Sequence, residues 1–339
     1  MNVKNRNSSF ELMRLILMLF IVTYHFLCYI YLYESGRADT IIRGAWIPLH
    51  VAVICFVLIS GYFHIRPSVK GAVKLLLPPI FFFSIPNVIA TACGADIGFF
   101  GGVKSLLFLS QSPYWFIRTY LYLFLISPIL NKYLDECDTR HKIVLICILA
   151  FIAVIEGLLG DPSLKDGKNL PMFMLVYVVG DFLRDKQCVV DKIKILHLSL
   201  GWVIFNICLV VIWMLIRNVI WGKVLWHLCF PYNSPLLIIN SIWFFMIFSR
   251  LTLNSTKINA MAASVFSIYI LQGQPILRTY LINPLLSYIY HGTCCNFFFL
   301  VEVLMLALLV VLFGIMLDIS FKPLFSFIQK KVEIINRIK

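Results

Sequence analysis

Residues 11–26, ELMRLILMLFIVTYHF, have the length and apolarity of a membrane helix, yet they include Glu11, Arg14 and His25. They belong to an apolar run over about 12–33, which two basic residues precede. The run is too long for a signal-peptide core, and no small-x-small cleavage site ends it. We therefore expect an uncleaved first transmembrane helix that carries ionisable groups at membrane depth.

The composition of the whole chain is typical of an integral membrane protein. Of its 339 residues, 61% are hydrophobic and 13% are charged, against about 25% charged in a typical soluble domain. Several apolar runs exceed 18 residues, the length needed to cross a hydrocarbon core of roughly 30 Å. We therefore expect an all-α, polytopic membrane helix bundle without a separate soluble domain.

The net charge of +13 has a simple interpretation in such a protein. It indicates membrane topology and contact with the anionic headgroups of the lipid bilayer, and it is not taken as a sign of nucleic-acid binding. The ten cysteines lie mostly inside apolar runs, and their spacing indicates neither a zinc site nor a disulfide framework. No metal and no nucleic-acid partner are expected.

Apolar runs separated by polar residues predict ten transmembrane helices in a single domain over 1–339. With the N-terminus in the cytoplasm, the inside segments carry 19 Lys and Arg residues and the outside segments carry 7, which agrees with the positive-inside rule. Both termini are therefore expected to be cytoplasmic, with 319–339 as a short basic tail. The predicted spans are 10–33, 46–64, 72–93, 114–134, 142–160, 169–184, 195–216, 235–251, 261–282 and 296–318.

The ionisable residues of the first span are predicted to form one polar stripe. Glu11 and Arg14 are three residues apart and can pair on one face of a helix. Arg14 and His25 are eleven residues apart, which is close to three turns, so they share a face and lie roughly 16 Å apart along the axis. A histidine can exchange protons or act as a nucleophile, and an arginine can bind phosphate or carboxylate. The alternative is structural: Arg14 pairs with Glu11, and His25 bonds a neighbouring helix.

Further basic and aromatic residues lie near the predicted ends of other spans. Arg66, Lys70 and Lys74 follow the second span, where they indicate either plain inside charge or a phosphate site on the cytoplasmic face. Arg118 lies about one turn inside the fourth span, just after the interfacial Trp115. It either extends toward the membrane surface or binds an anionic or hydroxylated substrate.

Acidic residues inside the spans are candidates for a supporting role. Glu156 and Glu302 both lie near predicted outer ends, and either one could orient the histidine of the first span or balance its charge. Asp181 lies near an inner end and is interpreted as paired or extended toward the interface. His50 and His227 lie near the outer interface and are interpreted as structural.

Four stretches resemble the motifs of acyltransferase family 3, the integral-membrane proteins of bacteria that O-acylate carbohydrates. They are RNSSFELMRLILMLFIVTYHF, FVLISGYFHIR, SPYWFIRTYLYLFLISPILNKYL and SVFSIYILQGQPILR. The first two are the most specific, and the first contains the family's arginine and histidine separated by ten residues. Together the stretches extend over about the whole chain, and the ten-helix layout agrees with the family.

The resemblance implies roles for the residues that match. His25 would be a base or a transient acyl carrier, and Arg14 its essential partner. The cytoplasmic side, where acyl-CoA is thought to enter, would use Arg14, Arg66, Lys70 and Lys74. The residues implied in the path or pocket of the acceptor are Trp115, Arg118 and, in the late motif, Gln272.

One position departs from the family pattern. The late motif in relatives usually reads Tyr-Leu-Ile-His, whereas this chain has Tyr269-Ile270-Leu271-Gln272. A glutamine can hydrogen-bond but cannot take a proton at neutral pH. Gln272 therefore fits a residue that positions substrate, and it does not fit a required base.

These observations lead to a functional hypothesis with two alternatives. The protein is expected to move an acyl group, taken as acetyl, from acyl-CoA to a sugar hydroxyl of a surface polysaccharide or a lipid-linked glycan precursor. Acetyl-CoA would be a donor substrate, with no permanently bound cofactor, and the location would be the bacterial cytoplasmic membrane. The alternatives are a transporter or flippase for a glycolipid or small solute, and a relative that has lost its chemistry. The oligomeric state is left open.

Overall fold

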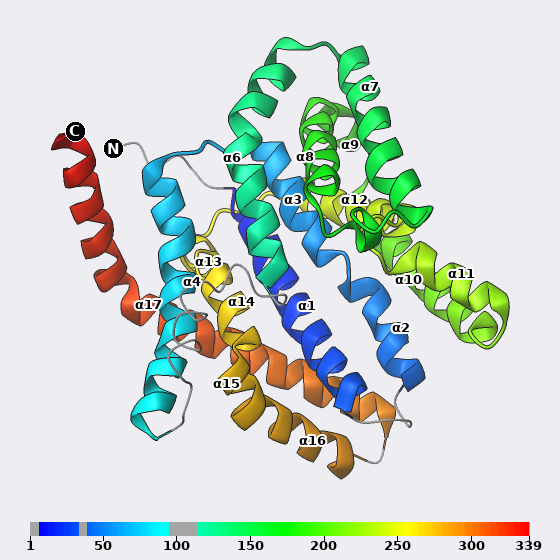
Figure 1. Cartoon of the computed structure of the whole chain (residues 1–339). Helices are drawn as coiled ribbons and strands as arrows, with labels where there is room; N and C mark the ends of the chain where they lie inside the picture. Colours follow the sequence, from blue (N-terminus) through cyan, green and yellow to red (C-terminus); the bar gives the residue numbers. More distant parts are fainter. Residues whose placement is uncertain (1–6, 34–38, 95–113, 294, 339) are drawn as a thin grey trace. The chain divides into compact units, whose positions relative to one another are not determined.

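The computed structural model describes residues 7–33, 39–94, 114–293 and 295–338. These residues form helices joined by turns and loops, and none of the described residues forms a strand (Figure 1). The chain divides into two units, which are described separately. The first comprises Met1–Ile21, Arg37–Arg66 and Phe116–Asn259, and the second comprises Val22–Gly36, Pro67–Trp115 and Ala260–Lys339.

The first helix, α1 (Ser8–Tyr33), supplies residues to both units. The other helical elements of the first unit follow in chain order. They are α2 (Asp39–Leu49), α3 (Ala52–Phe63), α6 (Trp115–Glu136), α7 (Thr139–Ala150), the π-helix Phe151–Glu156, the 3₁₀ turn Lys165–Gly167, α8 (Leu170–Asp185), α9 (Gln187–Val190), α10 (Ile195–Ile216), α11 (Ile220–Cys229) and α12 (Pro235–Ser249).

The second unit contains the long α17 and a helix that is interrupted. Its elements are α4 (Val69–Ala92), α14 (Val265–Gly273), α15 (Pro275–Leu277), the π-helix Arg278–Ile282, α16 (Asn283–Gly292) and α17 (Asn296–Ile338), and α13 (Thr256–Ala262) crosses the boundary between the units. Figure 1 shows that α17 changes direction along its length. Pro323 lies inside this helix, where a proline removes one backbone hydrogen bond and bends the axis.

Short polar side chains begin several of these helices. Ser68, Asp138, Asn169 and Ser234 each accept a hydrogen bond from a backbone N–H in the first turn of the helix that follows. The bond from the backbone N–H of His141, together with a second from its ring, holds the pKa of the Asp138 carboxyl below its usual value. These caps explain why helices start where the hydropathy changes.

The core of the first unit is built around α3. All ten residues from Ala52 to Gly61 are buried, and 78% of the most apolar window of the span Ile42–Phe63 is buried. Helix α8 approaches α3 closely because two glycines face the contact. A Cβ added at Gly61 would lie 2.0 Å from the carbonyl oxygen of Tyr177, and one at Gly180 would lie 2.4 Å from that of Leu58. Small residues allow helices to approach this closely in membranes.

The core of the second unit is formed by α4, α14 and α17, which contact one another. Phe81 of α4 packs against Phe321 and Phe325 of α17, with ring centroids 4.8 and 5.2 Å apart. The buried carboxylate of Asp318 on α17 accepts hydrogen bonds from the hydroxyls of Ser264, at 2.8 Å, and Ser267. These hydroxyls satisfy a carboxylate that is held away from water.

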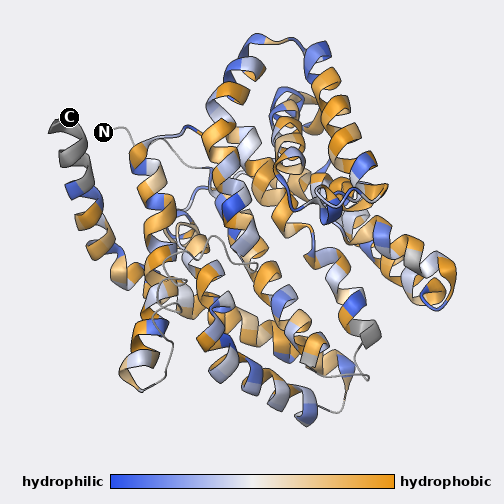
Figure 2. Cartoon of the chain, viewed as in Figure 1, coloured by the Kyte–Doolittle hydropathy of each residue, from blue (hydrophilic) through white to orange (hydrophobic). Residues whose placement is uncertain are grey.

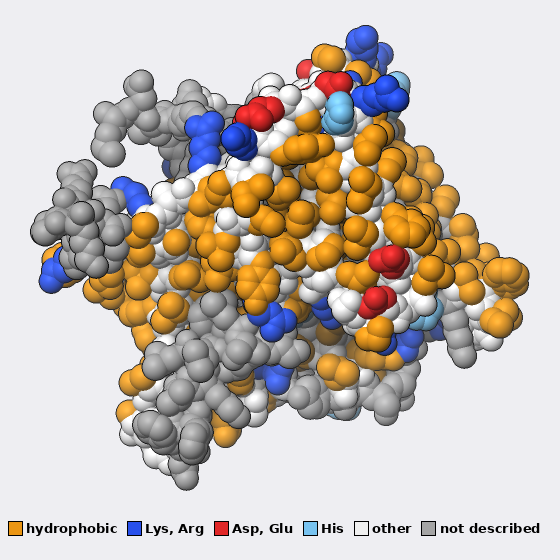
Figure 3. All heavy atoms as spheres, turned by 45° about the horizontal axis from the view of Figure 1, so that its top comes forward, with side chains coloured by type: hydrophobic (Ala, Val, Ile, Leu, Met, Phe, Trp, Pro, Cys, Tyr) orange, Lys and Arg blue, Asp and Glu red, His pale blue; other side chains and the backbone are white. Residues whose placement is uncertain are grey.

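Several helices present apolar side chains outward. Only 17% of the most apolar window of α10 and 28% of that of α17 is buried. Figure 2 shows hydrophobic residues along the helices and hydrophilic ones concentrated at many of their ends, and Figure 3 shows hydrophobic side chains over much of the visible surface. An exposed apolar surface of this extent is what the hydrocarbon of a bilayer covers. The protein is therefore an integral membrane protein.

Each predicted span corresponds to helical structure, but length and composition do not establish all ten. Among the described residues, five helices are long and apolar enough to cross a membrane, and a bent pair would make six. The structure differs from the prediction at 261–282, where the helix breaks and Thr256–Gly273 meets Pro275–Gly292 at 57°. Helix α17 continues through the predicted basic tail to Ile338, and the cytoplasmic location of that tail stays a prediction. The count of ten and the side of each terminus remain predictions.

The contact between α3 and α8 yields a first test. Gly180→Ala should lower the free energy of unfolding by about 1–3 kcal/mol, because the new methyl group meets backbone atoms that cannot move aside. Unfolding in mixed detergent micelles, followed by circular dichroism, measures the change. Gly292→Ala is the matched control, since a Cβ at that position meets nothing within 4 Å. Equal stabilities of the two variants would contradict the close contact.

Candidate active site

The ion pair predicted on α1 is confirmed. Arg14 Nη1 donates to Glu11 Oε1 at 2.7 Å, and the side chains of Arg14 and Glu11 are 30% and 7% exposed. A carboxylate as buried as Glu11 is stable in its charged form only when it is paired. The cation of Arg14 therefore stabilises Glu11 at a point that water reaches poorly.

Two serines fix the N-terminal end of α1 in the first unit. Ser9 Oγ donates to the carbonyl of Leu251 at 2.6 Å and accepts from the N–H of Leu253 at 3.1 Å. Ser8 Oγ accepts from the N–H of Ser255 at 2.8 Å. Both serines are fully buried. The segment that links α12 to α13 is thereby attached to the turn that precedes Arg14, which gives the Ser-Ser pair of the first motif a structural role.

The surroundings of Arg14 include a phenol from α6. The Tyr120 hydroxyl lies 3.1 Å from Ser60 Oγ on α3, and Tyr120 interacts electrostatically with Arg14. Arg118, two residues earlier on α6, is half-buried. Helices α1, α3 and α6 thus bring a guanidinium, a serine hydroxyl and a phenol into one polar region of the first unit.

His25 lies in the second unit among aromatic side chains. Its ring centroid is 5.8 Å from that of Tyr24, 6.2 Å from that of Tyr29 and 6.3 Å from that of Tyr269, and the ring of Tyr29 is stacked on it with an interplanar angle of 22°. The guanidinium carbon of Arg278 lies 5.3 Å from the centroid of the Tyr29 ring, within the range of a cation–π interaction. The imidazole is therefore set in a group of tyrosines with a cation at its border.

Only part of this group of residues around His25 could be identified from the sequence. Tyr29 is four residues after His25 and so shares its helix face, a signal that was available. Tyr269 belongs to the late motif that contains Gln272, but the sequence does not say that α14 packs near His25. Arg278 lies in the predicted ninth span without any spacing that links it to α1. These three residues are the additions that the structure makes to the candidate site.

Gln272 lies one turn after Tyr269 on α14 and is 2% exposed. Its Nε2 donates to the carbonyl of Tyr269 at 3.1 Å. Its Oε1 is buried and receives no hydrogen bond from the described part of the chain. Two residues further on, Gln274 and Pro275 interrupt the helix, and the side chain of Gln274 caps α15 by accepting from the N–H of Leu277. The interrupted helix therefore carries a buried acceptor next to its break.

The end of α3 is fixed by a network of hydrogen bonds that positions Arg66. His64 has a positive φ of 56°, which is uncommon for a residue with a side chain. The next residue, Ile65, donates its N–H to the Tyr177 hydroxyl at 2.9 Å and accepts from Asn131 Nδ2 at 2.7 Å. The Tyr177 hydroxyl in turn donates to Asn131 Oδ1 at 2.6 Å. Arg66 itself is exposed.

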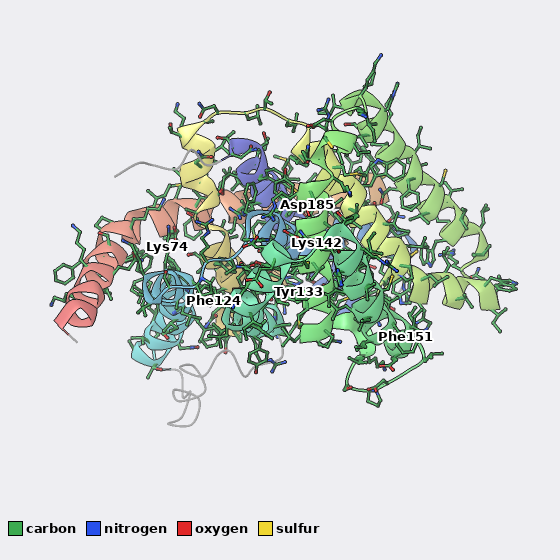
Figure 4. The ribbon with its side chains drawn as sticks, turned by 90° about the horizontal axis from the view of Figure 1, so that it is seen from above. Lys74, Phe124, Tyr133, Lys142, Phe151 and Asp185 are labelled. Carbon is green, nitrogen blue, oxygen red and sulfur yellow. The ribbon has the colours of Figure 1, made fainter. Side chains whose placement is uncertain are left out.

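A buried carboxylate also fixes the turn that follows α3. Asp181 of α8 is fully buried, and His64 Nε2 donates to it at 2.8 Å and Lys142 Nζ at 2.7 Å. Arg184 also donates to Asp181, and Lys142 donates to Asp185 at 2.6 Å, the pair labelled in Figure 4. Two carboxylates thus meet two permanent cations and one imidazole. The sequence interpretation of Asp181 as paired is confirmed, while the role of His64 and Lys142 was missed.

The remaining predicted site residues lie as follows. Lys70 and Lys74 are exposed and one turn apart at the start of α4 in the second unit, and Figure 4 labels Lys74. Trp115 begins α6 and is half-buried. Glu156 ends the π-helix of the first unit and is half-buried. Glu302 of α17 is exposed, and its carboxylate accepts a hydrogen bond from the Thr293 hydroxyl.

The fold and these groups define a class of protein. It is an all-helical integral membrane protein whose first helix carries an arginine in one polar region and a histidine in another. The family model described as an acyltransferase domain matches residues 7–321. The chain therefore belongs to acyltransferase family 3, and the predicted family is confirmed. A search of the curated proteins and a search of the solved structures found no match.

The Asp181 network leads to a second test. Lys142→Met should lower the free energy of unfolding by about 3–5 kcal/mol, because it removes the cation that Asp181 and Asp185 share and leaves the buried Asp181 carboxylate with Arg184 and His64 alone among the described residues. Unfolding in mixed micelles measures the loss. Lys132→Met is the control, since it removes the same charge from an exposed position on α6. A loss at Lys142 no larger than that at Lys132 would refute the structural importance of the network.

Proposed function

We propose that the protein is an O-acyltransferase that moves an acetyl group from acetyl-CoA to a sugar hydroxyl. The acceptor is a cell-surface polysaccharide or a lipid-linked glycan precursor, and the enzyme works in the bacterial cytoplasmic membrane. Family membership supports acyl transfer in general. The remaining steps of the proposal rest on the residues of α1 and on the groups around them.

The continuity of α1 is the observation that carries the proposal. Ser8–Tyr33 is one unbroken helix of 26 residues. Arg14 and His25 therefore keep the shared face and the axial separation of roughly 16 Å that an α-helix imposes on residues eleven apart. An extended donor needs a binding group at one end and a reacting group at the other. One helix supplies both without a change in conformation.

The donor end of the proposed site is cationic. A guanidinium carries five N–H donors, so Arg14 can hold Glu11 and still present donors to a phosphate of CoA. Arg66, Lys70 and Lys74 are exposed cations that suit the remaining phosphates. In this proposal Glu11 keeps Arg14 oriented, and the acyl end of the donor extends along α1 toward His25.

His25 supports two versions of the chemistry. As a base, the imidazole takes the proton of the sugar hydroxyl while the sugar oxygen attacks the thioester carbonyl. The C–S bond then breaks, and the CoA thiolate takes the proton from the imidazolium. As a carrier, an imidazole nitrogen attacks the thioester and CoA leaves as thiolate. The sugar oxygen then attacks the acyl-imidazole, the C–N bond breaks, and the hydroxyl proton passes to CoA. Both versions yield an ester and free CoA.

The acceptor end of the proposed site uses groups that bind hydroxyls. The buried Oε1 of Gln272 can accept a hydrogen bond from a sugar hydroxyl, and the tyrosines around His25 offer both donors and acceptors. Trp115 and Arg118 are proposed to line the approach of the acceptor. Glu156 and Glu302 remain proposed supporting acids beside Glu11.

Activity of purified protein tests the role of His25. In liposomes supplied with labelled acetyl-CoA and a lipid-linked glycan, His25→Ala should lower acceptor-dependent CoA release by at least about 100-fold, because general-base or nucleophilic assistance is lost. His197→Ala, which removes an exposed histidine at the start of α10, should retain the wild-type rate. Acetyl label that stays on the protein without acceptor, and is absent in His25→Ala, selects the carrier version.

The same assay separates the rival functions. Movement of a glycolipid or solute across the liposome membrane without CoA release would establish a transporter or flippase. Binding of acetyl-CoA without any transfer to a range of glycans would establish a relative without chemistry. Transfer that persists unchanged in His25→Ala would keep the enzyme and remove His25 from its centre.

Gln272 yields a separate prediction. Gln272→Leu should lower kcat/KM for the acceptor by roughly tenfold, because the buried acceptor for a substrate hydroxyl is lost while the side-chain volume is nearly kept. The KM for acetyl-CoA should not change. Steady-state kinetics with each substrate varied in turn measure both values. An effect confined to acetyl-CoA would contradict this placement of Gln272 in the acceptor site.

A further inference from the structure

Arg278 is an ionisable side chain of the second unit to which the proposed reaction gives no role. It lies in the predicted ninth span, 261–282, and it is half-buried. Its Nε is buried, and no hydrogen bond or ion pair joins the guanidinium to another residue that the structure describes. A cation at membrane depth is costly, and such residues mark the sites where membrane proteins bind their substrates. Arg278 is therefore a candidate for ligand binding.

The break in the helix before Arg278 is held by hydrogen bonds. Gln274 is fully buried; its Oε1 accepts from the N–H of Leu277 at 2.8 Å, and its Nε2 donates to Asn87 Oδ1 of α4 at 3.2 Å. The N–H of Arg278 donates to the carbonyl of Gln274 at 2.9 Å. The helix axis bends by 57° at this break, and a π-helix begins at Arg278 (Figure 1). Interrupted helices and π-helical turns are frequent at binding sites.

The Arg278 guanidinium lies over a ring that also neighbours His25. Its central carbon is 5.3 Å from the centroid of the Tyr29 ring, and the centroid of the His25 ring is 6.2 Å from that of Tyr29. Tyr114 is 1% exposed and interacts electrostatically with Arg278, and its ring centroid is 6.2 Å from that of Tyr269. The cation therefore lies beside the aromatic group that surrounds the imidazole.

The polar groups on the two sides of the helix break differ in what they can bind. A guanidinium that lies over an aromatic ring still presents N–H groups along its edge, and these groups can only donate. Their planar arrangement matches two oxygens of a phosphate or a carboxylate. Gln272, before the break, has a buried Oε1 that can accept from a hydroxyl. The interrupted helix thus carries a group for an oxyanion after its break and a group for a hydroxyl before it.

We propose that Arg278 binds an acidic group carried by the acceptor sugar, which makes the acceptor an anionic glycan. This inference rests on the proposed function, because His25 is taken as the group that meets the accepting hydroxyl. Since Arg278 and His25 both lie beside Tyr29, one monosaccharide with its acidic group can extend from the guanidinium to the imidazole. Two sources share this chemistry: the phosphate that links a sugar to a lipid, and an acid on the sugar itself.

Binding by the purified full-length protein in phosphatidylcholine nanodiscs tests the role of Arg278. Calorimetric titration with glucose 1-phosphate should show saturable binding that glucose does not reproduce. Arg278→Gln should weaken the affinity by roughly tenfold or more, because charge-assisted hydrogen bonds are lost. Arg278→Lys keeps the charge without the planar fork; it should weaken binding less, and it is the second variant if Arg278→Gln fails to fold. Arg140→Gln, which removes a guanidinium from an exposed position on α7, should leave the affinity unchanged.

The same titration with glucuronate identifies the source of the acidic group. Tighter binding of glucose 1-phosphate supports the phosphate of a lipid-linked sugar, and tighter binding of glucuronate supports an acid on the sugar itself. The proposal is overturned if neither anion binds, if glucose binds as tightly as the anions, or if the Arg278 variants bind both anions as tightly as Arg140→Gln does.

Kinetics separate this inference from the proposed acyl transfer. Binding that depends on Arg278, without CoA release from acetyl-CoA in the presence of any acceptor, would remove the proposed function while the binding of an acidic sugar by Arg278 stands. Where transfer occurs, Arg278→Gln should raise the KM for an anionic acceptor by roughly tenfold and leave the KM for acetyl-CoA unchanged. An equal rise in KM for a neutral acceptor would overturn the assignment of Arg278 to the acidic group.

Discussion

The first unit depends on one buried charge, the carboxylate of Asp181. A carboxylate removed from water is costly unless cations and hydrogen-bond donors surround it. Asp181 meets this requirement with Lys142 from α7, His64 from the end of α3 and Arg184 from its own helix. The three helices must therefore meet at their ends, and the glycine contact between α3 and α8 allows them to do so. The fixed turn after α3 then determines where Arg66 lies.

Helix α1 links this arrangement to the candidate chemistry. Its N-terminal part is bonded to the segment before α13 and carries the Glu11–Arg14 pair. Its C-terminal part carries His25 among tyrosines that belong to the second unit. Because the helix is unbroken, its own hydrogen bonds set the separation between cation and imidazole. The proposed reaction depends on the separation of Arg14 and His25 along α1, because the donor must reach from one to the other.

Much of the fold could be predicted because hydropathy and local chemistry carry it. The helical content, the bounds of α1 and α10, and the pairing of Glu11 with Arg14 follow from apolar runs and from spacing along one helix. The break at Gln274 was not predicted. Its neighbours are as apolar as those of any span, and a single Pro next to glutamine does not distinguish a kink from an interruption.

The candidate site was predictable only in part, for a related reason. Arg14 and His25 lie on one helix, so helix geometry alone relates them. Tyr269 and Arg278 join the site through contacts between segments that are far apart in the chain, and no spacing rule predicts such contacts. The sequence by itself determined the membrane class through its apolar runs, the family through the motifs that resemble it, and the pairing of Glu11 with Arg14 through their spacing on one helix. Only the tertiary structure decided which side chains surround each charge, because burial and pairing depend on how helices pack.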